Sequence, residues 1–164
     1  MDWSEYIDKV DFNEHQRTFN FMVSTGDICL TPNVLDDAHG HDKNKYNRIY
    51  EHKMFKAMLW WWQYKIGDVT LKELEKHCKK VLLEKGLDYS SPGDRLEHFI
   101  EGHRIYKNGV QSQIIHERSK HFISVLKIFD NPDEIQTTEY YNEKFGDYLN
   151  YTILLFYAVE CEIN

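Results

Sequence analysis

Apolar residues recur at intervals of three and four along most of the chain from residue 44 onward. The clearest run lies in 44–66, where the apolar positions are Tyr46, Ile49, Tyr50, Phe55, Met58, Leu59 and Trp62. This spacing places side chains on one face of a helix, and no segment shows the strict alternation of a half-buried strand. With only three prolines to interrupt helices, the sequence predicts an all-α bundle of about five or six helices.

Capping and helix-breaking residues set the expected ends of these helices. Thr70 and Glu73 have the spacing of a capping box, and Gly86 is expected to end the helix that they begin. The segment 24–43 is predicted to be a long loop. The expected helices are 11–23, 44–66, 70–85, 95–106, 110–129, and a last one from Asp133 or Thr137 to about residue 160.

The composition is typical of one folded domain. The chain has 164 residues, 41% of them apolar, which is enough for a hydrophobic core and excludes a disordered chain. Its formal charge of −7 argues against non-specific binding of nucleic acid. Three cysteines without close pairing favour a reducing compartment, and we see neither a signal peptide nor an apolar run long enough to span a membrane. We therefore expect a cytoplasmic protein.

The last predicted helix carries an acidic stripe. Glu139, Glu143 and Asp147 are each four residues apart, so their carboxylates share one face and repel one another. The stripe runs into the strongly apolar segment 152–159, which must be buried on most sides. Helical bundles build metal sites from carboxylates that lead into their interior, and Mg²⁺ prefers oxygen ligands. The alternative is a solvated helix face.

A second polar group precedes this helix. Glu117 and His121 are one helical turn apart, with Arg118 and Lys120 beside them. Such a group is either an ordinary mixture of surface charges or a cluster that faces phosphate, because lysine acts as a point charge on phosphates.

Several segments together resemble a known family. They resemble phage-associated helical domains linked to nucleotide modification, which are similar to the MazG-like all-α nucleoside triphosphate pyrophosphohydrolases. The resemblance covers about residues 70 to 160, so that 1–69 would be an N-terminal extension of the single domain. The sequence differs from the family pattern at His98, where the family has Asn, and at Ile123, where it has Arg. The matching segments are Lys85-Gly86-Leu87-Asp88-Tyr89, Arg95-Leu96-Glu97-His98-Phe99, the helix with Lys120, and Asp147-Tyr148-Leu149-Asn150-Tyr151.

The resemblance implies a magnesium-dependent hydrolase of nucleotide metabolism. It would release pyrophosphate from a nucleotide in the cytoplasm, that of the host if a phage encodes it, and would act as a homodimer. A Mg²⁺-bound water would attack the α-phosphorus. The implied roles are metal binding for Glu143, Asp147, Glu139 and Asp88, catalysis for Lys120 and Glu117, and nucleotide binding for Tyr89, Tyr151 and Arg118.

Two other functions stay open at this point. An acidic, tyrosine-rich helical protein could be a non-catalytic module that binds and inhibits a partner, with the stripe imitating nucleic-acid charge. The dipeptide His41-Asp42 is similar to the metal-binding pair of the HD phosphohydrolases, although here it follows a glycine in the predicted loop. In this alternative the protein would be an HD-type phosphohydrolase, and His41 and Asp42 would hold a divalent metal.

Overall fold

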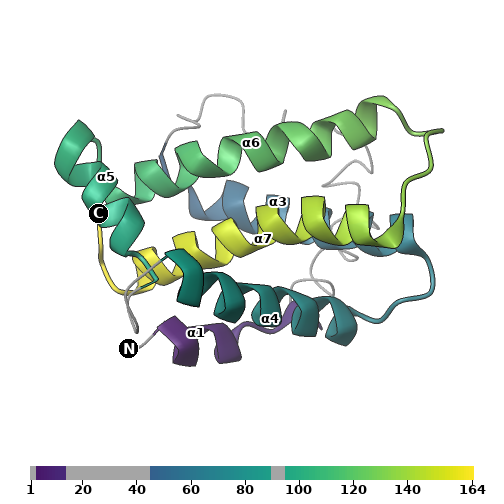
Figure 1. Ribbon diagram of the computed structural model, residues 1–164, viewed down its shortest axis with the longest axis horizontal. Helices are drawn as coiled ribbons and strands as arrows, with labels where there is room; N and C mark the ends of the chain where they lie inside the picture. The colour runs from purple at the N-terminus through teal and green to yellow at the C-terminus, as the bar shows by residue number, and fades with distance from the viewer. Residues whose placement is uncertain (1–2, 14–44, 90–94) are drawn as a thin grey trace.

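The computed structural model describes residues 3–13, 45–89 and 95–164, and of 86–89 only the backbone. The described residues form helices and no strand, so the predicted all-α bundle is confirmed (Figure 1). The loop predicted over 24–43 and most of the helix predicted over 11–23 lie outside the described residues. The helices are α1 (Trp3–Lys9), α3 (Arg48–Ile66), α4 (Leu71–Tyr89), α5 (Glu97–Tyr106), α6 (Val110–Asp130) and α7 (Thr138–Glu160).

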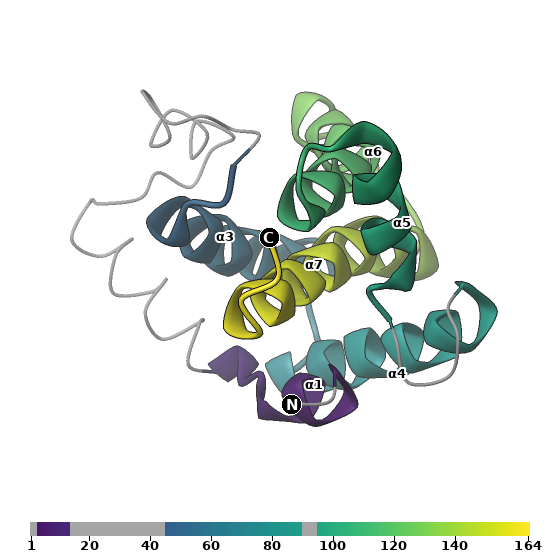
Figure 2. The ribbon, with the colours of Figure 1, turned by 90° about the vertical axis from the view of Figure 1, so that its left-hand side faces the viewer.

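The last helix, α7, is the centre of the bundle. In Figure 2 it lies among α3, α4 and α6, and it packs against each of them. The short connection between α6 and α7 makes these two helices antiparallel neighbours, as Figure 1 shows. Because α7 is covered on most sides, the apolar segment 152–159 is mostly buried, as the sequence predicted.

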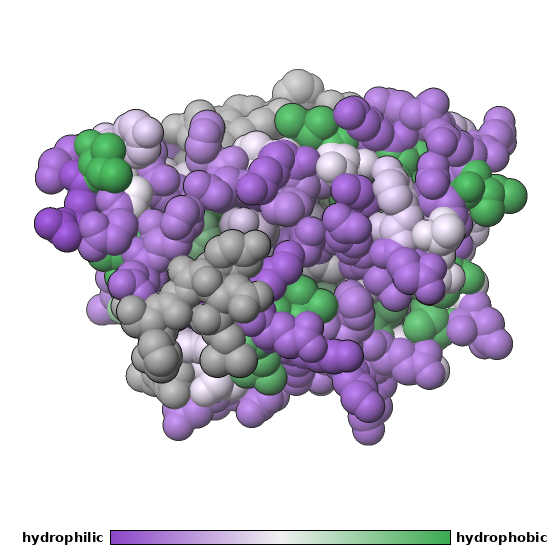
Figure 3. Space-filling view, viewed as in Figure 1, coloured by the Kyte–Doolittle hydropathy of each residue, from purple (hydrophilic) through white to green (hydrophobic). Residues whose placement is uncertain are grey.

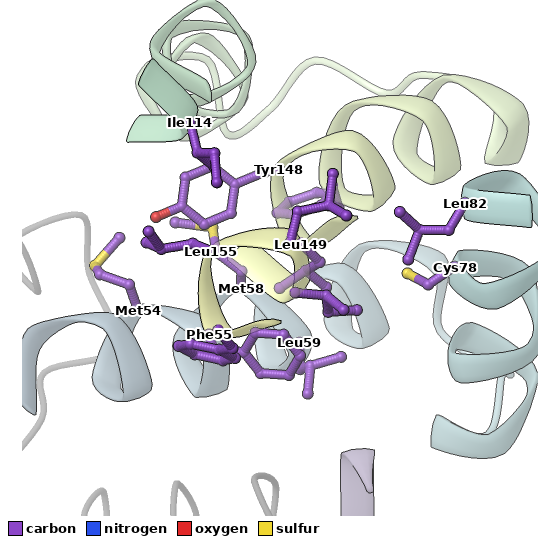
Figure 4. Close-up of a cluster of buried hydrophobic side chains, with 14 of the residues drawn as sticks. Met54, Phe55, Met58, Leu59, Cys78, Leu82, Ile114, Tyr148, Leu149 and Leu155 are labelled. Atoms are coloured by element: carbon purple, nitrogen blue, oxygen red, sulfur yellow. The ribbon is translucent and has the colours of Figure 1, made fainter. Parts of the chain in front are cut away.

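The hydrophobic core forms where side chains of four helices meet around α7 (Figure 4). Figure 4 shows Tyr148, Leu149 and Leu155 of α7 pointing toward side chains of the surrounding helices. The surrounding residues are Met54, Phe55, Met58 and Leu59 of α3, Cys78 and Leu82 of α4, and Ile114 of α6. This core fixes α4, α6 and α7, which carry most of the polar residues described below.

The helix ends follow the predicted caps in two places. The backbone N–H of Thr70 donates to the Glu73 carboxylate at 3.1 Å, and the N–H of Glu73 donates to the Thr70 hydroxyl at 3.2 Å, which confirms the capping box. The hydroxyl of Thr137 accepts from the N–H of Tyr140 at 3.1 Å and caps α7. The prediction that Gly86 ends α4 is wrong, since the helix continues to Tyr89. A single glycine costs a helix interior only about 1 kcal/mol, which a packed helix tolerates.

The face of the molecule seen in Figure 3 is mostly hydrophilic, with scattered hydrophobic residues. None of the helices in the described ranges combines the length and the apolar content that crossing a membrane requires.

Candidate functional site

A cavity of about 450 Å³ lies among α4, α5, α6 and α7. It holds most of the charged residues that the sequence singled out around Lys120 and Asp147. Its walls are formed by Leu82, Lys85, Arg95, His98, Phe99, Glu117, Lys120, His121, Asp147, Asn150, Tyr151 and Leu154. A second hollow, of about 510 Å³, lies against α1 and the start of α3 and contains none of the predicted site residues.

Helical spacing explains how two helices supply most of the lining. On α7, Asp147, Asn150, Tyr151 and Leu154 stand at positions i, i+3, i+4 and i+7, which share one face of a helix. On α6, Glu117, Lys120 and His121 have the same spacing. Because α6 and α7 are antiparallel neighbours, these two faces meet along the cavity.

Asp147 joins three helices at the cavity wall. Its Oδ1 lies 2.9 Å from Nζ of Lys85 on α4, and its Oδ2 lies 3.6 Å from Nδ1 of His121 on α6. The Asp147 side chain is only 12% exposed, so this ion pair is better shielded from water than a surface pair. Both carboxylate oxygens thus have a basic neighbour.

Burial lowers the pKa of His121 below its ordinary value of 6.5. Asp147 acts against this shift, while the positive charges of Lys120, Lys85 and Lys144 add to it. The imidazole is therefore neutral at pH 7 and has a lone pair that can accept a proton.

Cationic side chains from three segments reach the cavity. Lys85 comes from α4, Arg95 from the residues just before α5, and Lys120 from α6. Only two carboxylates, those of Asp147 and Glu117, line the same space. The whole chain has 27 acidic and 20 basic residues, whereas this lining has one more cation than carboxylate. Such an excess of positive charge attracts anions.

Aromatic rings form another part of the wall. The Tyr151 ring lies 4.8 Å from the His121 ring, centroid to centroid, with the planes tilted by 31°. Phe99 of α5 meets Tyr151 edge to face at 6.1 Å. Leu82 and Leu154 extend this wall with aliphatic surface. A flat, partly apolar group can lie against such a wall.

Asn150 has an unusual environment within the lining. Its residue is only 5% exposed, yet neither Nδ2 nor Oδ1 has a hydrogen-bond partner among the described residues. Most buried polar groups are hydrogen-bonded, because an unpartnered one loses its bonds to water without replacement.

Comparison with family models, with curated proteins and with solved structures finds no match to this chain. The resemblance to the MazG-like hydrolases therefore stays a prediction from sequence motifs. The site must be interpreted from its own chemistry.

The structure brings some of the predicted site residues together and leaves others apart. Lys120, Glu117, Asp147 and Tyr151 share the cavity. Glu139 and Glu143 are exposed and do not line it, and the Glu143 carboxylate lies 3.6 Å from Nζ of Lys144. The stripe therefore divides, with only its last member facing the cavity. The side chains of Asp88 and Tyr89 and the dipeptide His41-Asp42 lie outside the described residues.

Arg118 also lies outside the lining. Its guanidinium is buried and donates to both carboxylate oxygens of Glu51 on α3, the longer of the two bonds being 2.9 Å. It donates also to the hydroxyl of Thr152 at 2.9 Å. This side chain therefore ties α6 to α3 and α7, and we assign it no contact with a ligand.

Among the described residues no group of three or more His, Cys, Asp or Glu side chains could hold a metal ion. Both oxygens of Asp147 already face the basic groups of Lys85 and His121. Magnesium stays a prediction from the sequence.

The structure adds five polar residues to the predicted site. Lys85, Arg95, His98 and Asn150 were part of the matching segments but had no assigned role, and His121 was only a member of the charged group around Lys120. Nε2 of His98 lies 3.4 Å from the Glu117 carboxylate across the α5–α6 contact. Helical spacing could have placed two of these residues on the cavity face, Asn150 from Asp147 and His121 from Glu117.

Proposed function

We propose that the cavity binds a nucleoside triphosphate and that the protein hydrolyses it, releasing pyrophosphate. The observation that supports this proposal best is the meeting of Lys85, Arg95 and Lys120, from three separate segments, at one cavity. A triphosphate carries several negative charges, which need such a group of cations. The aromatic wall with Tyr151 and Phe99 suits a nucleobase, whose flat face stacks on rings.

The hydrolytic step is assigned to the pair of His121 and Asp147. The neutral imidazole of His121 accepts a proton from a water molecule through its second nitrogen, while Asp147 orients the ring through Nδ1. The water oxygen forms a bond to the α-phosphorus, and the bond from that phosphorus to the bridging oxygen breaks. Pyrophosphate leaves with the bonding electron pair. Lys120 and Lys85 balance the negative charge that gathers on the leaving group.

Mg²⁺ often enters a protein site bound to the phosphates of the substrate, with few protein ligands. The proposal therefore requires no metal held by Glu139 or Glu143. A homodimer and a cytoplasmic location stay predictions from the sequence.

The direct test incubates the protein with a panel of ribonucleoside and deoxyribonucleoside triphosphates, with and without Mg²⁺, and measures pyrophosphate. We expect release with at least one nucleotide and a loss of roughly 100-fold in Lys120→Ala, as for removal of one transition-state charge partner. Lys127→Ala is the matched control, because Lys127 is exposed on the same helix and lies outside the cavity. Equal effects of the two variants would contradict the assignment of the cavity.

A parallel thermal-shift measurement with the same nucleotides separates binding from hydrolysis. A nucleotide that raises the melting temperature without release of pyrophosphate would reduce the proposal to a nucleotide-binding module. Neither a shift nor pyrophosphate with any nucleotide would refute it and favour the non-catalytic interaction protein.

A further inference from the structure

We propose that the carboxamide of Asn150 binds the polar edge of the nucleobase, so that the cavity selects nucleotides over inorganic polyphosphates. This inference rests on the proposed function, because it assigns a second part of the ligand to the same cavity. It gives Asn150 the role of a specificity-determining residue.

Asn150 is a buried polar residue in the wall of the cavity. The residue is 5% exposed and lines the cavity, and both polar atoms of its side chain lack a hydrogen-bond partner in the described part of the chain. Folding has therefore removed a donor and an acceptor from water without satisfying either. A ligand in the cavity that supplies both partners resolves this, and its binding gains two hydrogen bonds that the empty protein lacks.

The carboxamide of Asn150 matches the edge of a nucleobase in its hydrogen-bonding groups. It presents one donor and one acceptor side by side in a plane, and each nucleobase has an edge with a donor next to an acceptor. Asparagine and glutamine read adenine in this way in DNA-binding proteins. Because none of the described residues fixes which atom of Asn150 is nitrogen and which is oxygen, the side chain can present the pair in either order.

Asn150 lies between the charged part and the aromatic part of the cavity wall. One turn earlier on α7 is Asp147, where Lys85 and His121 gather. The next residue on α7 is Tyr151, whose ring meets Phe99, and Leu154 follows one turn further along. A nucleotide with its phosphates near Lys85 and Lys120 would place its base toward Tyr151 and Leu154, within reach of Asn150.

The fold offers a matched control on the same helix. Asn142 of α7 accepts a hydrogen bond from Nε1 of Trp62 at 3.0 Å, so its carboxamide has a structural partner. Replacing Asn142 by leucine leaves the Trp62 N–H without its acceptor, and the melting temperature should fall. Replacing Asn150 by leucine breaks no hydrogen bond among the described residues, so the melting temperature of this variant should stay at or above that of the wild type.

The experiment measures the binding of the four deoxyribonucleoside triphosphates and of inorganic tripolyphosphate by calorimetry, together with the melting temperature. We expect Asn150→Leu to weaken the best nucleotide by about tenfold or more, the value of one two-bond base contact. The affinity of the Asn150→Leu variant for tripolyphosphate should stay within about twofold of the wild-type affinity, because tripolyphosphate has no base edge for Asn150 to bind. Lys120→Ala should weaken both ligands, and Asn142→Leu should change the preference for neither.

Three results would overturn the inference, and they differ from one another. Unchanged nucleotide affinity in Asn150→Leu would show that the amide does not touch the base. Equal losses for nucleotide and tripolyphosphate, with a lower melting temperature, would make Asn150 a structural residue like Asn142. Binding of neither ligand by the wild type would refute the proposed function itself, and the inference with it.

Discussion

Nζ of Lys85 lies 2.9 Å from Oδ1 of Asp147 and joins α4 to α7 at the wall of the cavity. In the sequence, Asp147 is the last carboxylate of a stripe with Glu139 and Glu143. In the structure those two glutamates are exposed, whereas the Asp147 side chain is 12% exposed and faces two basic groups. The basic groups that face the Asp147 carboxylate therefore come from α4 and α6. Asp147 is thus in a different environment from the two exposed glutamates of the stripe.

The first prediction distinguishes Asp147 from Glu143. Asp147→Asn removes the charge that orients His121, so pyrophosphate release should fall by roughly 100-fold or more. Nucleotide affinity should stay the same or increase, because Lys85 and Lys120 lose a competing negative charge. Pyrophosphate assays and calorimetry on one preparation measure both quantities. Glu143→Gln is the control and should leave both unchanged. A large loss of activity in Glu143→Gln would instead support the magnesium site expected from the sequence.

The second prediction concerns pH. Burial lowers the pKa of His121 and of His77 in the folded protein below the ordinary 6.5. As pH falls through 6.5, the unfolded chain takes up protons at these positions before the folded protein does. The free energy of unfolding should therefore decrease as pH falls below this value. Urea denaturation at about pH 7.5 and about pH 5.5, on either side of the ordinary histidine pKa, should show the loss.

Substitution at one histidine tests the cause of this pH dependence. His121→Gln should make the stability difference between the two pH values smaller, because one of the two titrating groups is gone. His116→Gln is the matched control, since His116 is exposed on the same helix. If His116→Gln reduced the difference as much as His121→Gln, burial in the cavity would not be its cause.

Local sequence patterns were enough to predict the helices from α3 onward. The three- and four-residue spacing gave α3, α6 and α7, and the side chains of Thr70 and Thr137 cap helices where the patterns placed them. The end of α4 was predicted wrongly at Gly86, because the loss of helix stability from one glycine is small beside the stabilisation from packing α4 against α7. Helix α1 was not predicted, although its apolar residues Trp3, Tyr6 and Ile7 have helical spacing.

The candidate site was predictable only in part. Antiparallel pairing of α6 and α7 about the short connection brings His121 opposite Asp147, since each is equally distant from Glu134 in that connection. Lys85 and Arg95 come from elements whose position depends on packing across the whole bundle, which no local pattern encodes. Arg118 belongs to the same charged cluster as Lys120 in the sequence, yet residues two positions apart on a helix point about 200° from each other, so Arg118 faces the core instead.

The third prediction tests the buried pair of Arg118 and Glu51. Arg118 is 4% exposed and Glu51 is 1% exposed, so removing one partner leaves a charge without compensation in the core. Glu51→Gln should lower the free energy of unfolding by about 3–5 kcal/mol, measured by urea denaturation. The double variant Glu51→Leu with Arg118→Met removes both charges and should recover most of that loss. It should also keep nucleotide binding, because neither residue lines the cavity.

An exposed pair on another helix is the comparison for this prediction. The guanidinium of Arg104 lies 3.0 Å from the Glu101 carboxylate on α5, and the two side chains are 70% and 55% exposed. Arg104→Ala should cost less than about 1 kcal/mol, as is usual for solvent-exposed pairs. A similar cost for Glu51→Gln would mean that water reaches the Arg118 guanidinium.

The last prediction compares two glycines inside helices. A Cβ at Gly146 of α7 would meet its nearest neighbour, Cδ2 of His77, at 3.5 Å, which is ordinary van der Waals contact. A Cβ at Gly102 of α5 would lie 2.6 Å from Oε1 of Gln113, a buried side chain that also donates to Asn108. Gly146→Ala should therefore raise the free energy of unfolding by about 0.5–1 kcal/mol through helix propensity. Gly102→Ala has the same propensity gain but must displace the Gln113 amide, so urea denaturation should show it less stable than Gly146→Ala. Replacing Gln113 by alanine in the Gly102→Ala background should remove that clash. If Gly102→Ala and Gly146→Ala had the same free energy of unfolding, the α5–α6 contact would be looser than described.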